Sequence, residues 1–215
     1  MKYELRAGVP AEIRATEDGG IAVSGYAAVF NQEADIGGMF REVIARGAFA
    51  DAIKRDDVVF VINHEGLPLA RTRSGTLKLT EDTHGLRMET TLDPDDPDVK
   101  SIVPKMKRGD LDKMSFAFWP EVQEWDESGE IPLRTVTKAR LHDVSIVTTP
   151  AYDGTEIGLR SLADHKKNKA EKQQNFDAVR RRLRMKANLA SRKRTAGGNG
   201  AVRPIPTNHD EKEKS

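Results

Sequence analysis

The sequence predicts a mainly β fold with flanking helices, followed by a basic C-terminal tail. Short apolar or alternating segments recur between Gly, Pro and Asp turn signals through the first 160 residues. Only two segments in that part are typical of helices, and the composition changes abruptly near Arg160. Together these observations favour one strand-rich domain with an appendage of a different kind.

Charge divides the chain at the same place. Residues 161–215 contain 15 Lys and Arg against 6 Asp and Glu, a net charge of +9, whereas the first 160 residues contain 20 and 28, a net charge of −8. We therefore expect a folded, strand-rich domain over residues 1–160 and a basic helical segment over residues 161–195. Residues 196–215 are rich in Gly, Pro and charge, which is typical of a disordered tail.

About seven strands are expected in the domain. Ile21–Phe30 follows the turn signal Gly19-Gly20, and Val58–Ile62 is an unbroken apolar run of the kind found in buried strands. The other predicted strands are Thr76–Leu79, Leu86–Leu92, Met114–Trp119, Leu133–Lys138 and Leu141–Thr148. Seven short strands of this kind favour a barrel or a sandwich.

Two helices are expected among these strands. Gly47–Lys54 predicts a short one, and the segment from about Asp95 to Arg108 predicts a longer one that ends at Gly109. The longer helix has one apolar face, formed by Val99, Ile102, Val103 and Met106. Asp95 or Asp96 can cap its start, and Pro104 predicts either a kink or a later start.

Several classes of protein are excluded or disfavoured by composition. The chain has no cysteine, which excludes disulfide scaffolds, thiolate catalysis and thiolate metal sites. No apolar run reaches the ~18–20 residues of a membrane helix, and the first residues lack the apolar core of a secretory signal. The five histidines are not spaced as metal pairs, and there is no Gly-rich phosphate loop, so we expect neither a metal nor a cofactor in a cytoplasmic protein.

His64 is a candidate general base. It comes directly after the predicted strand Val58–Ile62 and Asn63, and the end of a rigid strand is a good place to hold an imidazole. The unperturbed pKa of histidine, ~6.5, suits a base near neutral pH. Its position alone favours the alternative interpretation, a loop histidine without a chemical role.

Ser115 is a candidate nucleophile. Strand alternation places Met114, Phe116 and Phe118 on one face, which is expected to be core, and Ser115 and Ala117 on the other. A small hydroxyl on the second face could act in a shallow groove. Serine is also common in strands, so the alternation alone does not decide between these interpretations.

Asp143 is a candidate third member of such a site. Alternation places it on one strand face with Leu141, Ser145 and Val147. A carboxylate there is costly to bury unless it is paired, and a histidine would satisfy it. An exposed aspartate on an edge strand is the alternative, and His142 on the opposite face competes for the same role.

Six short segments then resemble one family in their order along the chain. Phage prohead maturation proteases, which are serine peptidases similar to the herpesvirus assemblins, show similar segments. In this sequence they are Gly25–Asn31, Gly47–Phe49, Asn63-His64, Arg71-Thr72 with Ser74–Leu77, Met114–Phe116, and Val144–Val147 with Pro150–Tyr152. The resemblance covers about residues 3–160.

The resemblance implies a closed, mainly antiparallel β-barrel with helices around it. It also implies a serine peptidase in which Ser115 is the nucleophile and His64 the base, with Asp143 as the third member. The third member of the assemblins is a histidine, so His142 remains the alternative.

The function implied by the resemblance is cleavage of a scaffold protein, or of the scaffold-like arm of the major capsid protein, inside the assembling prohead in the host cytoplasm. Cleavage of the protease itself and self-association are further implications. The alternative is a non-catalytic capsid-assembly protein that uses the basic tail as a docking arm. Non-specific contact of that tail with DNA is also open, whereas no membrane partner is expected.

Overall fold

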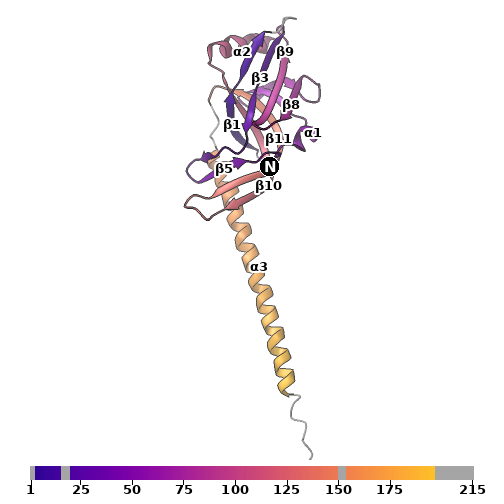
Figure 1. The fold of residues 1–215 in the computed structure, drawn as a ribbon, viewed down its shortest axis with the longest axis vertical. Coiled ribbons are helices and arrows are strands. Elements are labelled where there is room, and N and C mark those ends of the chain that lie inside the picture. Colours follow the sequence, from indigo (N-terminus) through magenta and orange to yellow (C-terminus); the bar gives the residue numbers. More distant parts are fainter. Residues whose placement is uncertain (1–2, 16–19, 150–153, 197–215) are drawn as a thin grey trace, which may run out of the picture. The chain divides into compact units, whose positions relative to one another are not determined.

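The computed structural model describes residues 3–15, 20–149 and 154–196 (Figure 1). The chain forms two compact units, Met1–Ala163 and Asp164–Ser215. The first unit contains the strands, two complete helices and the start of a third, long helix, and the described part of the second unit is the rest of that helix. The predicted mainly β architecture with helices is confirmed.

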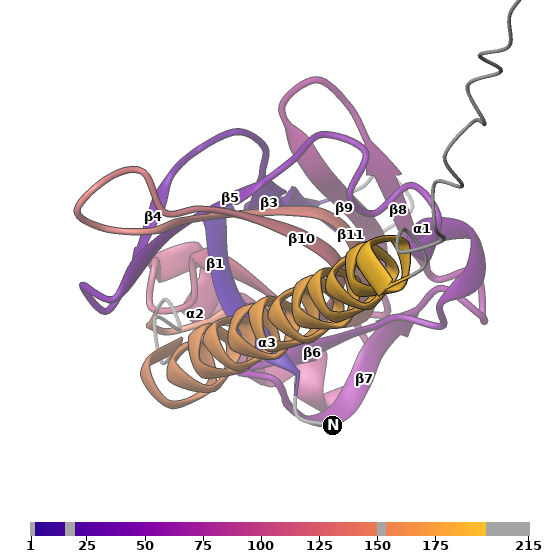
Figure 2. The same cartoon turned by 90° about the horizontal axis from the view of Figure 1, so that it is seen from below.

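The larger sheet, sheet A, is built around two long neighbouring strands, β10 (Lys113–Asp126) and β11 (Leu133–Val147), which pair antiparallel. Strand β1 (Glu4–Pro10) pairs with the other side of β10. The first half of β11 pairs in parallel with β5 (Phe40–Ile44), which in turn pairs with β4 (Ala34–Ile36). Figure 2 shows β4, β5, β10 and β11 alongside one another.

The second half of β11 has a different parallel partner, β6 (Val59–Ile62), which forms a hairpin with β7 (Glu65–Arg71). The short helix α1 (Ala52–Arg55) lies between β5 and β6 in the chain. Because β11 is paired with β10 along its length and with β5 and β6 in turn, it is the central strand of the unit.

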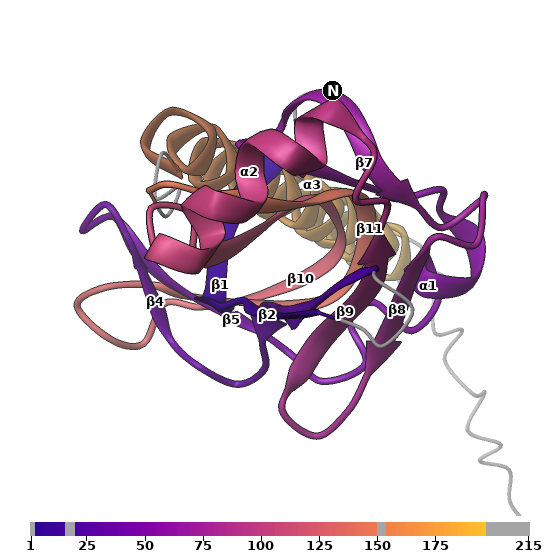
Figure 3. The same ribbon diagram turned by 90° about the horizontal axis from the view of Figure 1, so that it is seen from above.

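A second sheet, sheet B, has the order β2-β3-β9-β8, all antiparallel (Figure 3). Its strands are β2 (Glu12–Ala15), β3 (Ile21–Val29), β8 (Leu77–Glu81) and β9 (Gly85–Leu92). Both β1 and β10 contact β3, so the two sheets enclose a common apolar core.

Helix α2 (Pro97–Arg108) forms as the sequence predicts. The side chain of Asp96 accepts a hydrogen bond from the backbone N–H of Asp98, and Gly109 ends the helix in the left-handed conformation. The helix continues through Pro104. All four residues of its predicted apolar face are buried in the core: Val99, Ile102, Val103 and Met106.

The strand prediction was incomplete. The described residues contain eleven strands rather than about seven, and the two strands predicted at 133–138 and 141–148 form one strand, β11. Five strands were missed: β1, β2, β4, β5 and β7. Of these, β2, β4 and β5 are only three to five residues long, and β1 and β7 each contain a proline and charged residues, which weakens a strand pattern. The strands form two sheets, and β5 and β6 pair with β11 in parallel, so the implied closed, mainly antiparallel barrel is not shown among the described residues.

The long helix α3 (Gly154–Ala196) includes the segment expected to be a basic helix. The expected disordered tail, residues 196–215, lies outside the described residues apart from Ala196. None of the helices in the described part combines the length and apolar character that a membrane span requires.

Candidate active site

The turn between β6 and β7 places His64. Ile62 pairs with Glu65, so the loop is only Asn63-His64, with φ angles of 50° and 62°. Two successive positive φ values are typical of a tight type I′ turn, a conformation that asparagine tolerates better than most residues. The backbone N–H of Asn63 donates to the Ile146 carbonyl at 3.0 Å. The turn is therefore fixed against β11.

The face alternation of β10 places Ser115 as the sequence predicts. Met114, Phe116 and Phe118 are buried in the core, and Ser115 lies on the opposite face. However, Ser115 has no exposed surface, so the expected shallow groove is wrong for this structure. A cavity of about 580 Å³ beside β1 is lined by Arg6 and Phe116 but not by Ser115.

A β-bulge in β11 places Asp143. Asp143 lies opposite Ala117 and Leu141 lies opposite Phe118, so His142 is an extra residue between two pairs. As a result, Leu141 packs into the core while Asp143 lies on the Ser115 face. The prediction that Leu141 and Asp143 share a face was therefore wrong, because simple alternation does not anticipate a bulge.

The three candidate side chains meet in one hydrogen-bonded chain. The His64 Nε2 atom is 2.7 Å from the Ser115 Oγ atom, and the His64 Nδ1 atom is 2.6 Å from the Asp143 Oδ1 atom. Only 6% of the imidazole and 3% of the Asp143 side chain are exposed. Since a carboxylate only accepts, Nδ1 donates to Asp143 and leaves Nε2 to accept the Ser115 proton.

The Ser115 hydroxyl has a second acceptor within reach. Its Oγ atom is 2.8 Å from the carbonyl oxygen of Arg6 on β1. One hydroxyl proton can be donated to either His64 or Arg6, but not to both at once. If His64 carries a second proton, Nε2 donates to Ser115 and the hydroxyl donates to Arg6, so every group remains paired.

His142 lies away from this chain of hydrogen bonds. Its ring is exposed and stacks on Tyr3, with 4.7 Å between the ring centroids. It also meets Trp119 edge-on at 5.2 Å. The structure therefore brings Asp143, and not His142, to His64.

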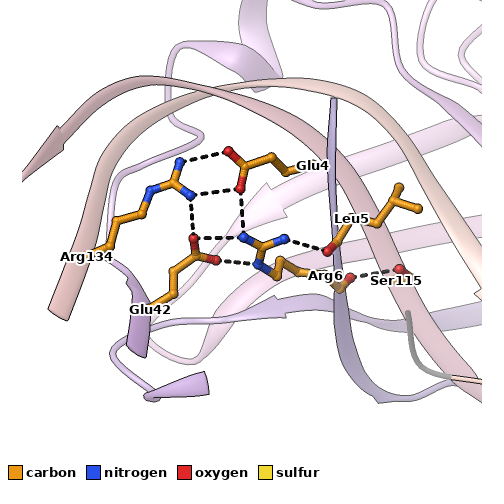
Figure 4. Close-up of polar contacts among 6 residues, drawn as sticks. All are labelled: Glu4, Leu5, Arg6, Glu42, Ser115 and Arg134. Atoms are coloured by element: carbon orange, nitrogen blue, oxygen red, sulfur yellow. Dashed lines mark hydrogen bonds and ion pairs between the residues drawn. The ribbon is translucent and has the colours of Figure 1, made fainter. Parts of the chain in front are cut away.

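Four buried charged side chains were missed by the sequence reasoning. Arg6 donates to Glu42 at 2.6 Å and to Glu4 at 2.7 Å, and Arg134 donates to Glu42 at 2.9 Å and to Glu4 at 2.8 Å (Figure 4). Burial alone would lower the pKa of Arg6, but the charges and hydrogen bonds of Glu42 and Glu4 outweigh it and raise that pKa. This ion network joins β1, β5 and β11 on the core side of the strand pair that places Ser115.

Comparison with known families agrees with this geometry. A family model described as the caudovirus prohead serine protease matches residues 9–169. The chain belongs to the caudovirus prohead serine protease family. The family resemblance predicted from the six sequence segments is thereby confirmed. Neither the curated proteins nor the solved structures gave a match to this prohead protease family member.

The matched region contains the whole hydrogen-bonded chain. Ser115, His64 and Asp143 all lie within residues 9–169, and the match ends inside α3. Family membership implies a serine peptidase that takes part in capsid maturation.

Proposed function

We propose that this protein is a serine endopeptidase in which Ser115 is the nucleophile, His64 the general base and Asp143 the group that orients the base. The observation that carries the proposal is the unbroken hydrogen-bonded chain from Ser115 through His64 to Asp143 in a member of a serine protease family. An alcohol, an imidazole and a carboxylate in this order are the parts that acyl transfer by serine requires.

In the proposed mechanism, Ser115 Oγ attacks the scissile carbonyl carbon as Nε2 of His64 takes the hydroxyl proton. The tetrahedral intermediate collapses, the peptide C–N bond breaks, and His64 returns the proton to the leaving amine. Water then attacks the acyl-enzyme while His64 takes its proton, and the proton is returned to the Ser115 oxygen as the acid product leaves. Asp143 holds the Nδ1–H tautomer and stabilises the imidazolium.

Substrate binding must also open the site. A reacting carbonyl carbon has to approach the Ser115 oxygen to about 3–3.5 Å, whereas Ser115 is fully buried in the free protein. We therefore expect the substrate to expose Ser115 as it binds. In the same step, the Ser115 hydroxyl turns its hydrogen bond from the Arg6 carbonyl to Nε2 of His64.

The substrates that we propose follow from family membership. They are the scaffold protein or the scaffold-like arm of the major capsid protein, together with the protease itself, cut inside the assembling prohead in the host cytoplasm. Enclosure in a shell gives substrate and protease a high local concentration, so a slow enzyme with modest affinity suffices.

Co-expression with the capsid and scaffold proteins tests this function directly. Mass spectrometry should detect defined fragments with the natural sequence and none with Ser115→Ala. Asp143→Asn should lower the cleavage rate about 10⁴-fold, since the tautomer is no longer fixed. Ser128→Ala, which changes an exposed serine, is the matched control and should cleave normally. Normal cleavage by folded Ser115→Ala would contradict the assignment.

A further inference from the structure

Ser145 is a buried hydroxyl beside the proposed catalytic chain that the mechanism above does not use. It lies on β11 directly opposite Ser115 on β10, and none of its surface is exposed. Its Oγ atom is 2.9 Å from Asp143 Oδ1, 3.1 Å from His64 Nδ1 and 3.2 Å from the backbone nitrogen of His64. One hydroxyl thus contacts the carboxylate, the imidazole and the turn that holds the imidazole.

The hydrogen-bonding capacity of a hydroxyl decides how these contacts are used. A serine side chain has one proton to donate and two lone pairs to accept with. Because the carboxylate can only accept, the Ser145 proton is donated to Asp143. The backbone N–H of His64 donates to one lone pair of the Ser145 oxygen. The Nδ1 atom is 2.6 Å from Asp143 Oδ1 and 3.1 Å from Ser145 Oγ, so its one proton is donated mainly to Asp143 and shared with the second lone pair of Ser145.

This arrangement argues against Ser145 as a nucleophile. A nucleophilic hydroxyl must give its proton to the nitrogen that acts as the base. Ser145 lies at Nδ1, which donates to Asp143, whereas Ser115 lies at Nε2. Ser145 therefore lies at the Nδ1 side of the imidazole, which is hydrogen-bonded to Asp143 and does not take the proton of the nucleophile.

The contacts of Ser145 fix two things at once. Its proton gives Asp143 Oδ1 a second donor besides Nδ1–H, which restricts the rotation of the carboxylate. Its lone pair anchors the His64 backbone N–H, in a turn whose two residues both have positive φ. Together they set the distance between β11 and the β6–β7 turn, and through it the approach of Nε2 to Ser115.

We propose that Ser145 is a positioning residue that holds His64 and Asp143 in the geometry for proton transfer from Ser115. The proposal rests on the proposed function, because it assigns Ser145 to the same reaction. Displacing a reacting group by about 1 Å can slow a reaction by about 100-fold, so the loss of these contacts should affect the chemical step.

The decisive comparison is between Ser145→Thr and Ser145→Val, which have the same shape and differ only in the hydroxyl. With a peptide substrate cut by the natural enzyme, kcat should fall about 10- to 100-fold in Ser145→Val and Ser145→Ala, with KM changed less than about threefold. Ser145→Thr should restore most of kcat. Thr137→Ala, which removes an exposed hydroxyl from the same strand, is the control and should retain natural kcat.

A spectroscopic signal separates positioning from a general structural effect. The proton on His64 Nδ1 should give a far-downfield NMR resonance that moves in Ser145→Val and Ser145→Ala and returns in Ser145→Thr. Equal kcat values and unchanged resonances in the Thr and Val variants would overturn the proposal for Ser145.

Failure of the proposed function would look different. In that case the natural protein would neither cleave the capsid and scaffold proteins nor react at Ser115 with an organophosphonate. The resonance comparison would still show whether Ser145 holds the imidazole, because it does not depend on turnover.

Discussion

At the scale of single residues, the turn Asn63-His64 combines backbone strain with a chemical task. Both residues have positive φ, which costs an ordinary side chain roughly 1–2 kcal/mol. Asparagine lowers this cost, and its Oδ1 atom also accepts a hydrogen bond from the backbone N–H of Thr148 at 3.1 Å. The strain at His64 is the cost of turning the imidazole back toward β11 within two residues.

Substitution of Asn63 should separate the contribution of its backbone conformation to stability from that of its side-chain hydrogen bond. Asn63→Ala loses both the tolerance of positive φ and the acceptor, so the free energy of unfolding should fall by about 1–3 kcal/mol. Asn63→Gly loses the acceptor but tolerates positive φ, so its free energy of unfolding should fall by less than that of Asn63→Ala. Urea unfolding measures both values.

Asn31 offers a matched control, since its φ is also positive, at 55°, and it lies outside the hydrogen-bonded chain of the site. Asn31→Ala should lower stability but leave the reaction of Ser115 with an organophosphonate unchanged. Asn63→Ala should slow that reaction as well. Equal stability of the Ala and Gly variants at position 63 would show that the turn is not strained.

Only some of the candidate site residues could be predicted from the sequence. Ser115, His64 and Asp143 were predicted as site residues because the order of six short segments resembles a family, not because their spacing brings them together. The contacts of Ser145 and of the Arg6 carbonyl with this group could not be predicted, since both depend on strand register. A backbone carbonyl also leaves no signal in the sequence.

At the scale of elements, Asp56 links the end of α1 to β11. Its side chain is 3% exposed, accepts a hydrogen bond from the Leu141 N–H at 2.9 Å and pairs with Arg55 at 2.7 Å. Burial alone would raise the pKa of Asp56, but the hydrogen bonds from Arg55 and Leu141 and the charges of Arg55 and Arg140 lower it. The contact with Leu141 lies directly beside the bulge that turns Asp143 onto the Ser115 face.

The lowered pKa of Asp56 predicts a pH-dependent stability. A carboxylate with a lower pKa in the folded state stabilises the fold above its unfolded pKa, about 3.9, and this contribution is lost as the pH falls through the folded value. Asp56→Asn keeps an acceptor but removes the charge, so at pH 7 it should lower the free energy of unfolding by about 1 kcal/mol.

The difference between Asp56→Asn and the natural protein should shrink as the pH falls below about 4. Urea unfolding at several pH values measures it. Asp110→Asn, which removes an exposed carboxylate paired with Arg108, is the control and should have a smaller effect at neutral pH. A difference that stays constant with pH would contradict the role of the Asp56 charge.

Elements with a strong periodic pattern of apolar residues were predictable, whereas strands that depend on contacts with distant residues were not. Helix α2 has its apolar face, cap and final glycine in the sequence, so its bounds were within two residues of those observed. Strand β1 places Glu4 and Arg6 in the interior, where only Glu42 and Arg134 make burial acceptable. No local sequence pattern predicts such a strand, because the residues that pair with Glu4 and Arg6 lie far away in the sequence.

At the scale of the whole molecule, the chain combines an acidic strand-rich unit with a basic helical one. In the second unit, the described residues of α3 are mostly exposed, and Phe176, Val179 and Leu183 recur at helical spacing among basic side chains. An exposed apolar stripe within positive charge is suited to a partner that is acidic and amphipathic. We propose that this unit docks the protease on capsid or scaffold protein.

Truncation separates the two units functionally. Removal of residues 170–215 leaves the proposed catalytic residues and all their hydrogen-bond partners in place, so cleavage of a peptide in solution should be within about twofold of the natural rate. Incorporation of the truncated protein into proheads should fall, as measured by its amount in purified particles.

Normal incorporation of the truncated protein would count against docking. In that case, DNA binding that weakens steeply with salt and requires residues 170–215 would support the alternative interpretation of the basic segment.

The first strand contributes both to the buried ion network and to the hydrogen bonds of Ser115. Glu4 and Arg6 supply two of the four charges, and the Arg6 carbonyl also accepts from Ser115. If residues 1–6 dissociated after a cut just after Arg6, Glu42 and Arg134 would each lose one of their two charged partners in the network, and Ser115 would lose the Arg6 carbonyl as an acceptor. For an enzyme proposed to digest itself, we therefore expect such a cut to inactivate the site.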